Sequence, residues 1–421
     1  MNLKPHQLTG VAWAKAIRRG ILADDPGLGK TATAIVAAVE CGTARKVVVL
    51  PSNLAPNWRR EIKQWAEEPV FECDGKPRKP PSSAQWVLVS YARLGKWAGA
   101  LKSWCADPFL IFDESHELRG VDSKRSADAM RFCRGVTRIL MLTGTPFVNH
   151  PAELLVQLQC LRRLEDFGGS LYFKRHFCSG RMVDGRMVYG KPKQPEVFHR
   201  ILKATCMLRR TKEDIGGFTR KLAVWNNVNV AGVASHLEAA KSRLYSDDQR
   251  LSAARWAVGV AKIPAVVARA QERIDAGDRV LIFAHHQDVT EGIAQRLECP
   301  RINGNIPPAA RQQIVDRFQK GHHDALVVSW TAGGVGLNLQ RANAVLIAEY
   351  PWHPAAIEQG ADRAHRIGQQ DDVEVEWIHA VDTVDEHLVT LIAKKASMFN
   401  AAVEGEQFVG MVADAMEVSR C

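Results

Sequence analysis

The sequence lacks several features that would place it in familiar classes of protein. None of its nine cysteines forms a Cys-x-x-Cys pair, so a zinc finger or zinc ribbon has no support. No run of eighteen uncharged apolar residues occurs, and the N-terminal MNLKPHQLTGVAW lacks the apolar core and small-residue cleavage site of a signal peptide. We therefore expect reduced thiols, no membrane span and a cytoplasmic location.

Internal repeats at a fixed period and low-complexity tracts are also missing from the sequence. The composition is that of a soluble globular protein, with 46% hydrophobic and 24% charged residues. A length of 421 residues exceeds what one ordinary core organises and is sufficient for two lobes.

Positive charge is concentrated in one segment of the chain. The net charge is +10, and residues 151–220 contain 14 Lys or Arg against 7 Asp or Glu, which is +7 of that total. A basic surface can simply keep a protein in solution. Its concentration in a single segment favours a polyanionic partner, and nucleic acid in particular.

Short apolar segments alternate with predicted helices in two separate parts of the chain. In the first part, buried strands are expected at residues 20–23, 46–50, 86–89, 109–112 and 138–142. In the second part, the pattern predicts strands at residues 280–283, 325–328 and 344–347. Apolar strands separated by helices are typical of a parallel sheet. The sequence therefore predicts an α/β fold with two parallel-sheet lobes.

The segment between these parts does not follow the alternating pattern. It reads as mostly helical, with a loop containing glycine, lysine and proline at residues 179–195. We accordingly divide the chain into a first lobe at residues 1–152, a basic helical insert and linker at 153–258, a second lobe at 259–396 and a tail at 397–421.

A glycine-rich turn follows the first predicted strand and opens a helix, which is the context that a phosphate-binding loop requires. The turn is DDPGLGKT at residues 24–31, with aspartate where the general motif has glycine. Its glycines let backbone N–H groups curl around phosphate oxygens, and the helix N-terminus adds its positive end. Lys30 can neutralise the terminal phosphates of ATP, and the Thr31 hydroxyl can bind Mg²⁺. The predicted ATP-binding residues here are Asp25, Pro26, Gly27, Leu28, Gly29, Lys30 and Thr31.

Two carboxylates follow another apolar strand, in the string FLIFDESH at residues 109–116. Open α/β sheets bind ligands at the carboxyl ends of their strands. Asp113 is predicted to hold Mg²⁺ through its hydration shell, and Glu114 to orient and polarise the attacking water. His116 either couples this site to the next motif or caps the turn.

At this point the sequence resembles the Swi/Snf-type ATPases of helicase superfamily two. ADDPGLGKT at residues 23–31 is similar to their ADDMGLGKT, which also has aspartate at the first position. DESH is one variant of their second motif, and LTGTP at residues 142–146 matches their third. KPHQ at residues 4–7 resembles the Q motif, which implies that Gln7 recognises adenine. PSNL followed by Trp58 resembles a segment that meets the DNA backbone.

The second part of the chain continues the resemblance, which extends from Lys4 to about Ala396. FAHH at residues 283–286 matches the fourth motif, and SWTAGGVGLNL at residues 329–339 resembles the fifth, which implies that Gly336 contacts ATP. QGADRAHRIGQ at residues 359–369 is close to the sixth motif, and MLRRTK at residues 207–212 matches a segment that precedes the second lobe.

Arg363 and Arg366 are the catalytic candidates of the second lobe. Their spacing of three would place them on one face of a helix. A guanidinium from the opposite lobe can stabilise charge that develops on the γ-phosphate, an effect on the order of 10³–10⁵ in rate in other phosphate-cleaving enzymes.

The resemblance implies a DNA-dependent ATPase that translocates on duplex DNA or remodels it. The implied DNA contacts are Ser52, Ser90, Thr145, His285 and Thr331, and the implied coupling residues are His116, Thr143, Thr145 and Gln359. In the insert, Lys174 and Arg175 either clamp DNA or are solvated charges on a packed helix. DESH, the histidine pair and YPWHP at residues 350–354 are most similar to the compact annealing-helicase branch, and a motor this small would suit a bacterium or a phage.

Three alternatives stay open at the sequence level. The chain could be a nucleic-acid-binding protein with an inert nucleotide site, although the intact Lys30, Glu114 and arginines argue against this. It could also be a strand-separating helicase, or the motor subunit of a repair or restriction complex. We expect a monomer that uses ATP and Mg²⁺ and binds duplex or forked DNA.

Overall fold

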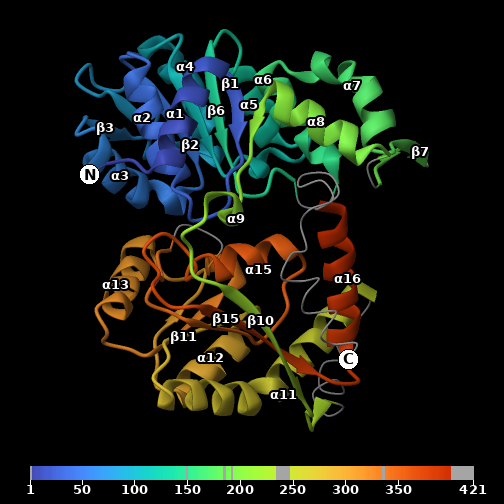
Figure 1. Cartoon of the computed structure of the whole chain (residues 1–421). Coiled ribbons are helices and arrows are strands. Elements are labelled where there is room, and N and C mark those ends of the chain that lie inside the picture. Colours follow the sequence, from blue (N-terminus) through green and yellow to red (C-terminus); the bar gives the residue numbers. More distant parts are fainter. Residues whose placement is uncertain are drawn as a thin grey trace. The chain divides into compact units, whose positions relative to one another are not determined.

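The computed structural model describes residues 2–147, 150–183, 186–190, 193–233, 247–333 and 337–399. Apart from the C-terminal tail, the chain divides into two compact units, Met1–Gly216 and Gly217–Ser397, called here the first and second domains (Figure 1). Each contains one parallel sheet. The expected α/β fold with two parallel-sheet lobes is confirmed.

The first domain is built on a seven-stranded parallel sheet. Each strand expected from an apolar segment is present to within a residue or two, and KVVVL is buried along its whole length. In sheet order the strands are β3 (Val70–Glu72), β4 (Trp86–Ser90), β2 (Lys46–Leu50), β5 (Phe109–Asp113), β6 (Arg138–Leu142), β1 (Arg19–Leu22) and β9 (Met207–Leu208).

Helices connect these strands, as parallel pairing requires. They are α1 (Pro5–Ile17), α2 (Lys30–Glu40), α3 (Ala55–Trp65), α4 (Tyr91–Trp104), α5 (Lys124–Phe132), α6 (Leu155–Leu161), α7 (Gly169–Tyr172), α8 (Pro195–Thr205) and α9 (Lys212–Ile215). Short turns of other helix types are η1 (Ser52–Leu54), η2 (Ser115–Leu118), η3 (Pro151–Leu154), η4 (Leu164–Phe167) and η5 (Phe173–Phe177).

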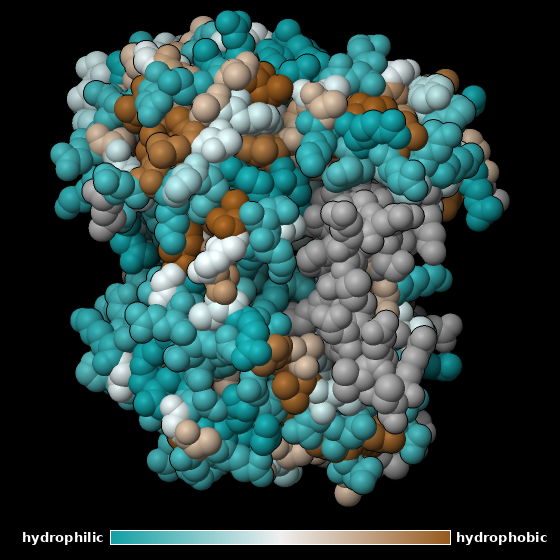
Figure 2. Space-filling model, viewed as in Figure 1, coloured by the Kyte–Doolittle hydropathy of each residue, from teal (hydrophilic) through white to brown (hydrophobic). Residues whose placement is uncertain are grey.

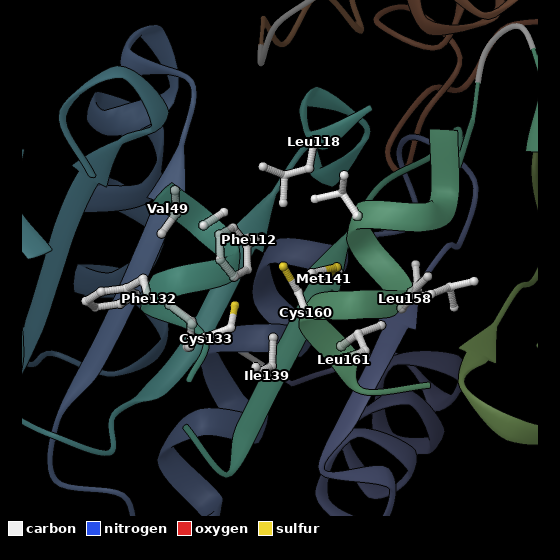
Figure 3. Packing of buried hydrophobic residues seen from close by; sticks show 14 of the residues in the cluster. Val49, Phe112, Leu118, Phe132, Cys133, Ile139, Met141, Leu158, Cys160 and Leu161 are labelled. Atoms are coloured by element: carbon white, nitrogen blue, oxygen red, sulfur yellow. The ribbon is translucent and has the colours of Figure 1, made fainter. Parts of the chain in front are cut away.

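The core of the first domain lies between the sheet and helices α5 and α6. Figure 3 shows Phe112, Ile139 and Met141 of the central strands packed with Phe132 at the end of α5 and Leu158 of α6. All five are almost completely buried. Burial of such a side chain contributes about 1.5–3 kcal/mol, so this layer fixes the strands that end in the carboxylates.

The second domain contains a six-stranded parallel sheet. In sheet order its strands are β10 (Lys221–Val228), β15 (Val373–Ala380), β14 (Ala344–Ile347), β11 (Val280–Ala284), β13 (Ala325–Ser329) and β12 (Arg301–Ile302). The helices are α11 (Asp247–Asp275), α12 (Gln287–Arg296), α13 (Pro308–Gln319), α14 (Trp330–Gly333), α15 (Pro354–Ala361) and α16 (Val384–Phe399).

One stretch of α11, Arg250–Asp275, is long and apolar enough to cross a membrane by length and composition alone. This is weak evidence for a membrane span, because the core helix of a soluble protein can have the same length and composition. The buried Lys262 of this helix pairs with Asp385 at 2.8 Å.

The expected insert at residues 153–258 is divided between the two domains. Strand β9 pairs with β1, so the chain up to that point belongs to the first sheet, whereas β10 pairs with β15 in the second. The crossing falls at Gly216 and Gly217, with φ of 68° and 72°, a conformation that glycine adopts without strain. Both strands pair with partners distant in sequence, so no local pattern could assign them to a sheet.

Candidate nucleotide site and nucleic-acid contacts

The predicted phosphate loop connects β1 to α2, and its backbone has the conformation that the glycines were expected to allow. Gly27 and Gly29 have φ of 89° and 82°, and Gly29 is the residue before the first turn of α2. The φ of Gly29 would strain any larger residue, and a Cβ atom there would also displace the Gln7 side chain, whose Nε2 would lie 2.1 Å away. The loop therefore presents N–H groups at a helix N-terminus, as phosphate binding requires.

Lys30 points back into the loop, where its ammonium donates to Asp24 O at 2.5 Å and Asp25 O at 3.1 Å. Burial lowers the pKa of Lys30, an effect that the charges of Glu114, Asp24 and Asp25 oppose. The ammonium is thus within electrostatic range of a carboxylate that follows β5, some eighty residues later in the sequence.

Asp113 is the last residue of β5 and is buried. Trp58 Nε1 donates to its Oδ2 at 2.6 Å, and Glu114 N donates to its Oδ1 at 3.0 Å. Burial and the neighbouring Glu114 carboxylate raise the pKa of Asp113 to about 7, although the Trp58 bond and Lys30 oppose the shift. An acid held in this way is stabilised by a cation. Asp113 and the Thr31 hydroxyl are oxygen donors, the class that Mg²⁺ prefers.

Glu114 has a left-handed backbone, with φ of 49°, so the chain turns sharply after the strand. The turn is held against the third motif by two links. His116 Nδ1 lies 3.2 Å from Thr143 Oγ1 and 3.4 Å from Glu114 Oε2. Ser115 donates to Gln157 at 2.8 Å, and Gln157 in turn donates to Pro146 O at 2.9 Å. The geometry thus connects His116, Thr143 and Glu114, as the coupling hypothesis requires.

Sequence reasoning missed the importance of two arginines in the segment 207–212. Arg209 pairs with Asp25 at 2.8 Å and donates to Ala23 O at 2.6 Å and Gly144 O at 3.2 Å. Arg210 forms a bidentate pair with the buried Asp24. The Asp25 side chain is therefore occupied by this segment, and any contact of Asp25 with ATP would come from its backbone. The paired DD and RR were a signal in the sequence that charge complementarity could have identified.

The Q-motif residues lie against the same loop. His6 Nε2 and Leu28 O are 3.0 Å apart, and Gln7 Nε2 donates weakly to Leu28 O at 3.4 Å. The side-chain oxygen of Gln7, Oε1, accepts a hydrogen bond from Lys4 N at 2.8 Å. Both side chains are buried. Gln7 is thus oriented beside the phosphate loop.

In the second domain, the histidine pair after β11 surrounds a buried glutamate that the sequence did not reveal. Glu349 Oε2 accepts from the backbone N–H groups of His285 at 2.7 Å and His286 at 2.9 Å, and Oε1 lies 2.6 Å from His286 Nδ1. Burial alone would raise the pKa of Glu349, but these donors lower it. Burial, Arg255 and His286 lower the pKa of His285, so that its neutral form is favoured.

The helical placement of Arg363 and Arg366 is corrected by the structure. Helix α15 ends at Ala361, and both arginines lie in the turns that follow. Beyond the helix, the backbone hydrogen bonds that both arginines donate join residues that are closer in sequence than the four-residue spacing of an α-helix. Arg363 N donates to Gly360 O, three residues back, and Arg366 N donates to Ala364 O, two residues back. Leu339 N donates a hydrogen bond to Arg363 O. Both arginines are partly buried, and Gln359 precedes them on α15.

The other candidates for nucleic-acid contact are dispersed. Ser52 is exposed in η1, Ser90 is half-buried before α4, and Thr145 is buried, with its N–H bonded to Thr143 Oγ1 at 3.1 Å. Thr331 is exposed in α14, 3.1 Å from Ser329 Oγ. In η5, Arg175 is exposed and Lys174 is partly buried. Gly336 lies outside the described residues, as does nearly all of the tail at 397–421.

Comparison with known proteins shows that these motifs lie within two known domain families. The chain matches the SNF2-related domain over residues 6–257 and the helicase conserved C-terminal domain over residues 262–368. It is 30% identical over 435 residues to SWI/SNF-related matrix-associated actin-dependent regulator of chromatin subfamily A-like protein 1 of Xenopus tropicalis, a match that covers 95% of this chain and 45% of the relative. It is 26% identical over 446 residues to human DNA annealing helicase and endonuclease ZRANB3, covering 96% of this chain and 41% of the relative.

The chain spans less than half the length of these two relatives. Among solved structures it is similar to the Sulfolobus solfataricus SWI2/SNF2 ATPase core in complex with dsDNA, with a TM-score of 0.46 and 22% identity over 96% of this chain and 94% of that one. The SNF2-related domain alone accounts for more than half of the 421 residues, and a helicase C-terminal domain follows it. The chain therefore belongs to the SNF2-related family and consists mainly of the two domains of its helicase-type ATPase core.

Proposed function

We propose that this chain is a DNA-dependent ATPase that couples ATP hydrolysis to translocation on duplex DNA or to its remodelling. The observation that carries the proposal is the electrostatic cluster at the end of β5. Lys30 of the phosphate loop, the buried Asp113 and Glu114 affect one another's charge there. Family membership supports ATP as the nucleotide.

Each residue of the cluster has one task in this scheme. The Lys30 ammonium exchanges its two loop carbonyls for phosphate oxygens. Glu114 orients the attacking water and accepts its proton. Thr31 and Asp113 would hold Mg²⁺, which when bound would neutralise phosphate charge. The fit is chemical: one hydroxyl and one buried carboxylate with a pKa raised to about 7 benefit from a nearby cation.

Coupling to the second domain uses the links around the site. His116 and Thr143 connect the water-activating Glu114 to the third motif. Arg209 and Arg210 connect the two loop aspartates to the segment that leads to Gly216 and Gly217. We assign Arg363 and Arg366 to the γ-phosphate in the closed state of the motor, so that hydrolysis and opening are linked.

The grip on DNA is assigned to polar groups that meet the sugar–phosphate backbone: Ser52, Ser90, Thr145, His285 and Thr331. Phosphate contacts contain no sequence information, so binding is expected to tolerate any sequence. We also propose that the chain acts as a monomer.

The test measures ATPase rate against matched duplex, single-stranded and forked DNA and RNA, followed by two strand assays. A third strand in the major groove should be displaced in an ATP-dependent way, whereas a simple tailed duplex should not be unwound. The Glu114→Gln protein should bind the triplex and displace nothing. Efficient unwinding of the tailed duplex would favour a strand-separating helicase instead, and absence of stimulation by any nucleic acid would reject the proposal.

A further inference from the structure

The part of the first domain between α7 and α8 presents an unusual number of apolar side chains to solvent. Six of the eight large hydrophobic residues that are exposed among the described residues lie between Leu171 and Val197. Three of them are on a two-stranded antiparallel hairpin, β7 (Arg181–Val183) and β8 (Arg186–Val188), where the sequence predicted only a loop. Met182 is 62% exposed, Val183 40% and Val188 41%. Exposed apolar side chains that gather in one region commonly mark an interaction site.

The hairpin projects from the edge of the domain beyond α7 and α8 (Figure 1). In the same view, Figure 2 shows hydrophobic side chains over the α7–α8 region, within a largely hydrophilic surface. The exposed apolar side chains of the hairpin therefore belong to a protrusion, and those of α7 and α8 lie beside it.

The base of this protrusion is rigid. Phe167, Phe173, Phe177 and Phe198 are buried and pack as a cluster, with ring centroids 5.6–6.2 Å apart. Each buried ring contributes both apolar area and a favourable ring–ring geometry. The exposed side chains of the hairpin are thus not part of the phenylalanine cluster that packs beneath it.

Two glycines fix the points where the hairpin leaves this base. Gly180 N donates to Lys174 O at 2.8 Å, and Gly190 N donates to Cys178 O at 2.9 Å. A Cβ atom on Gly180 would lie 2.6 Å from Lys174 O, so only glycine permits this approach. The direction of the hairpin is therefore set by backbone bonds on both sides.

The charge around the hairpin is strongly positive. Residues 171–203 contain eight Lys or Arg against two Asp or Glu. Arg175 and Arg181 are both exposed, and Arg181 directly precedes Met182. An apolar protrusion with this charge is complementary to DNA, where phosphates flank an apolar stack of bases.

We propose that the β7–β8 hairpin enters a groove of duplex DNA and places Val183 and Val188, which the register puts on the same face of the hairpin, against the base stack, while the surrounding arginines contact phosphates. A two-stranded ribbon fits the major groove, and apolar side chains that wedge between base steps are used in the minor groove. This inference rests on the proposed function, since it takes DNA as the substrate, and adds a contact with bases to the backbone contacts assigned above.

Apolar and electrostatic contributions to DNA affinity can be separated by salt. Binding of a short labelled duplex is measured by fluorescence anisotropy from about 50 to 200 mM salt. The double variant Val183→Ser, Val188→Ser should lose about tenfold in affinity at every salt concentration with an unchanged log–log slope, because it removes apolar area from one face of the hairpin and no charge. Arg175→Ala with Arg181→Ala should instead reduce the slope by about 0.9 for each phosphate that is no longer neutralised. Val197→Ser on α8, also exposed, is the matched control and should resemble the wild type.

A second readout reports the bases directly. Wild-type protein should raise the fluorescence of 2-aminopurine placed inside the duplex, and the Val183→Ser, Val188→Ser protein should lose this signal while its unfolding temperature stays unchanged. If DNA still stimulates ATP hydrolysis but the double variant binds and unstacks like the wild type, the hairpin proposal is overturned, and a protein partner becomes the better occupant. If both signals fall as expected but no DNA stimulates hydrolysis, the hairpin proposal stands and the proposed function fails.

Discussion

Two buried carboxylates at the ends of parallel strands have pKa values that are shifted in opposite directions. Asp113, at the end of β5 in the first domain, has one side-chain donor, Trp58, and a second carboxylate beside it, and its pKa is raised to about 7. Glu349, two residues after β14 in the second domain, has two backbone N–H groups and His286, and its pKa is lowered. Burial acts on both in the same direction, so the neighbouring groups decide the outcome: the Glu114 charge adds to the rise for Asp113, whereas His286 and the backbone N–H groups outweigh burial for Glu349.

The difference indicates where the chemistry of the proposed ATPase would take place. A carboxylate left with unfavourable charge is prepared for a cation, and the protein tolerates that cost where function requires it. A carboxylate surrounded by donors is part of the framework. We therefore assign metal binding and water activation to the first domain, and to the second a frame that presents the catalytic candidates Arg363 and Arg366 and the histidine pair.

The largest effect is expected when the contribution of the second domain is removed. Arg366→Ala should reduce the maximal ATPase rate by about 10³-fold or more while ATP affinity stays within a few-fold, because the guanidinium acts only on charge that develops during the reaction. Steady-state kinetics and fluorescent-nucleotide binding measure the two quantities. Arg296→Ala, which removes an arginine that donates to Gly292 within α12, serves as the control. A large loss of nucleotide affinity at an unchanged maximal rate would contradict the assignment.

Removal of the proton acceptor in the first domain should have the next largest effect. Glu114→Gln should decrease the maximal rate by about 10²–10⁴-fold with ATP binding retained, because the amide cannot accept a proton from water. Glu117→Gln, three residues away and paired with Arg125, should remain close to wild type. Turnover by the Glu114→Gln protein near the wild-type rate would show that another group activates water.

In the framework of the second domain, the expected loss is one of stability. Glu349→Ala should reduce the free energy of unfolding by about 3–5 kcal/mol, because it leaves two partly buried N–H groups and His286 without their acceptor. Urea unfolding of the purified variant measures this change. Glu291→Ala, at a half-buried position with a long contact of 3.3 Å to Arg301, should change stability by about 0.5 kcal/mol or less. Equal losses for the two variants would remove the distinction between Glu349 and a surface charge.

Local sequence patterns were sufficient for most of the first domain. KVVVL, FLIFD and RILML are strands because their residues are apolar and mostly β-branched or large, and the sheet buries them on both faces. The phosphate loop was predictable because Gly27, Gly29 and Lys30 occur together in one short segment, and its chemistry needs that spacing.

What could not be predicted depends on residues distant in sequence. Glu349 is more than sixty positions from the histidines that it holds, and the pairing of Arg210 with Asp24 spans 186 positions. The end of α15 before Arg363 also has a tertiary cause, since Leu339 takes the carbonyl that a longer helix would use. The β7–β8 hairpin was hidden because glycine, lysine and arginine around it indicate a loop, while its apolar side chains face solvent and produce no core pattern.

The smallest change in stability should come from the removal of the charge on Asp113, and this change is a gain. In the folded protein Asp113 ionises at a pKa of about 7, against 3.8 in the unfolded chain. The folded state therefore holds more protons than the unfolded state between these values, and stability falls as pH rises across that window. Asp113→Asn has no charge to bury, and its one oxygen serves only one of the two donors, Trp58 Nε1 and Glu114 N, which reduces the gain. It should therefore stabilise the metal-free protein by about 2 kcal/mol above pH 7 and by almost nothing near pH 4. Thermal unfolding in EDTA across this pH range measures the gain, and hydrolysis by the variant should be lost. Asp122→Asn, outside the cluster, is the control. A variant as stable as the wild type at every pH would mean that the charge of Asp113 costs the fold nothing, and the contrast with Glu349 would disappear.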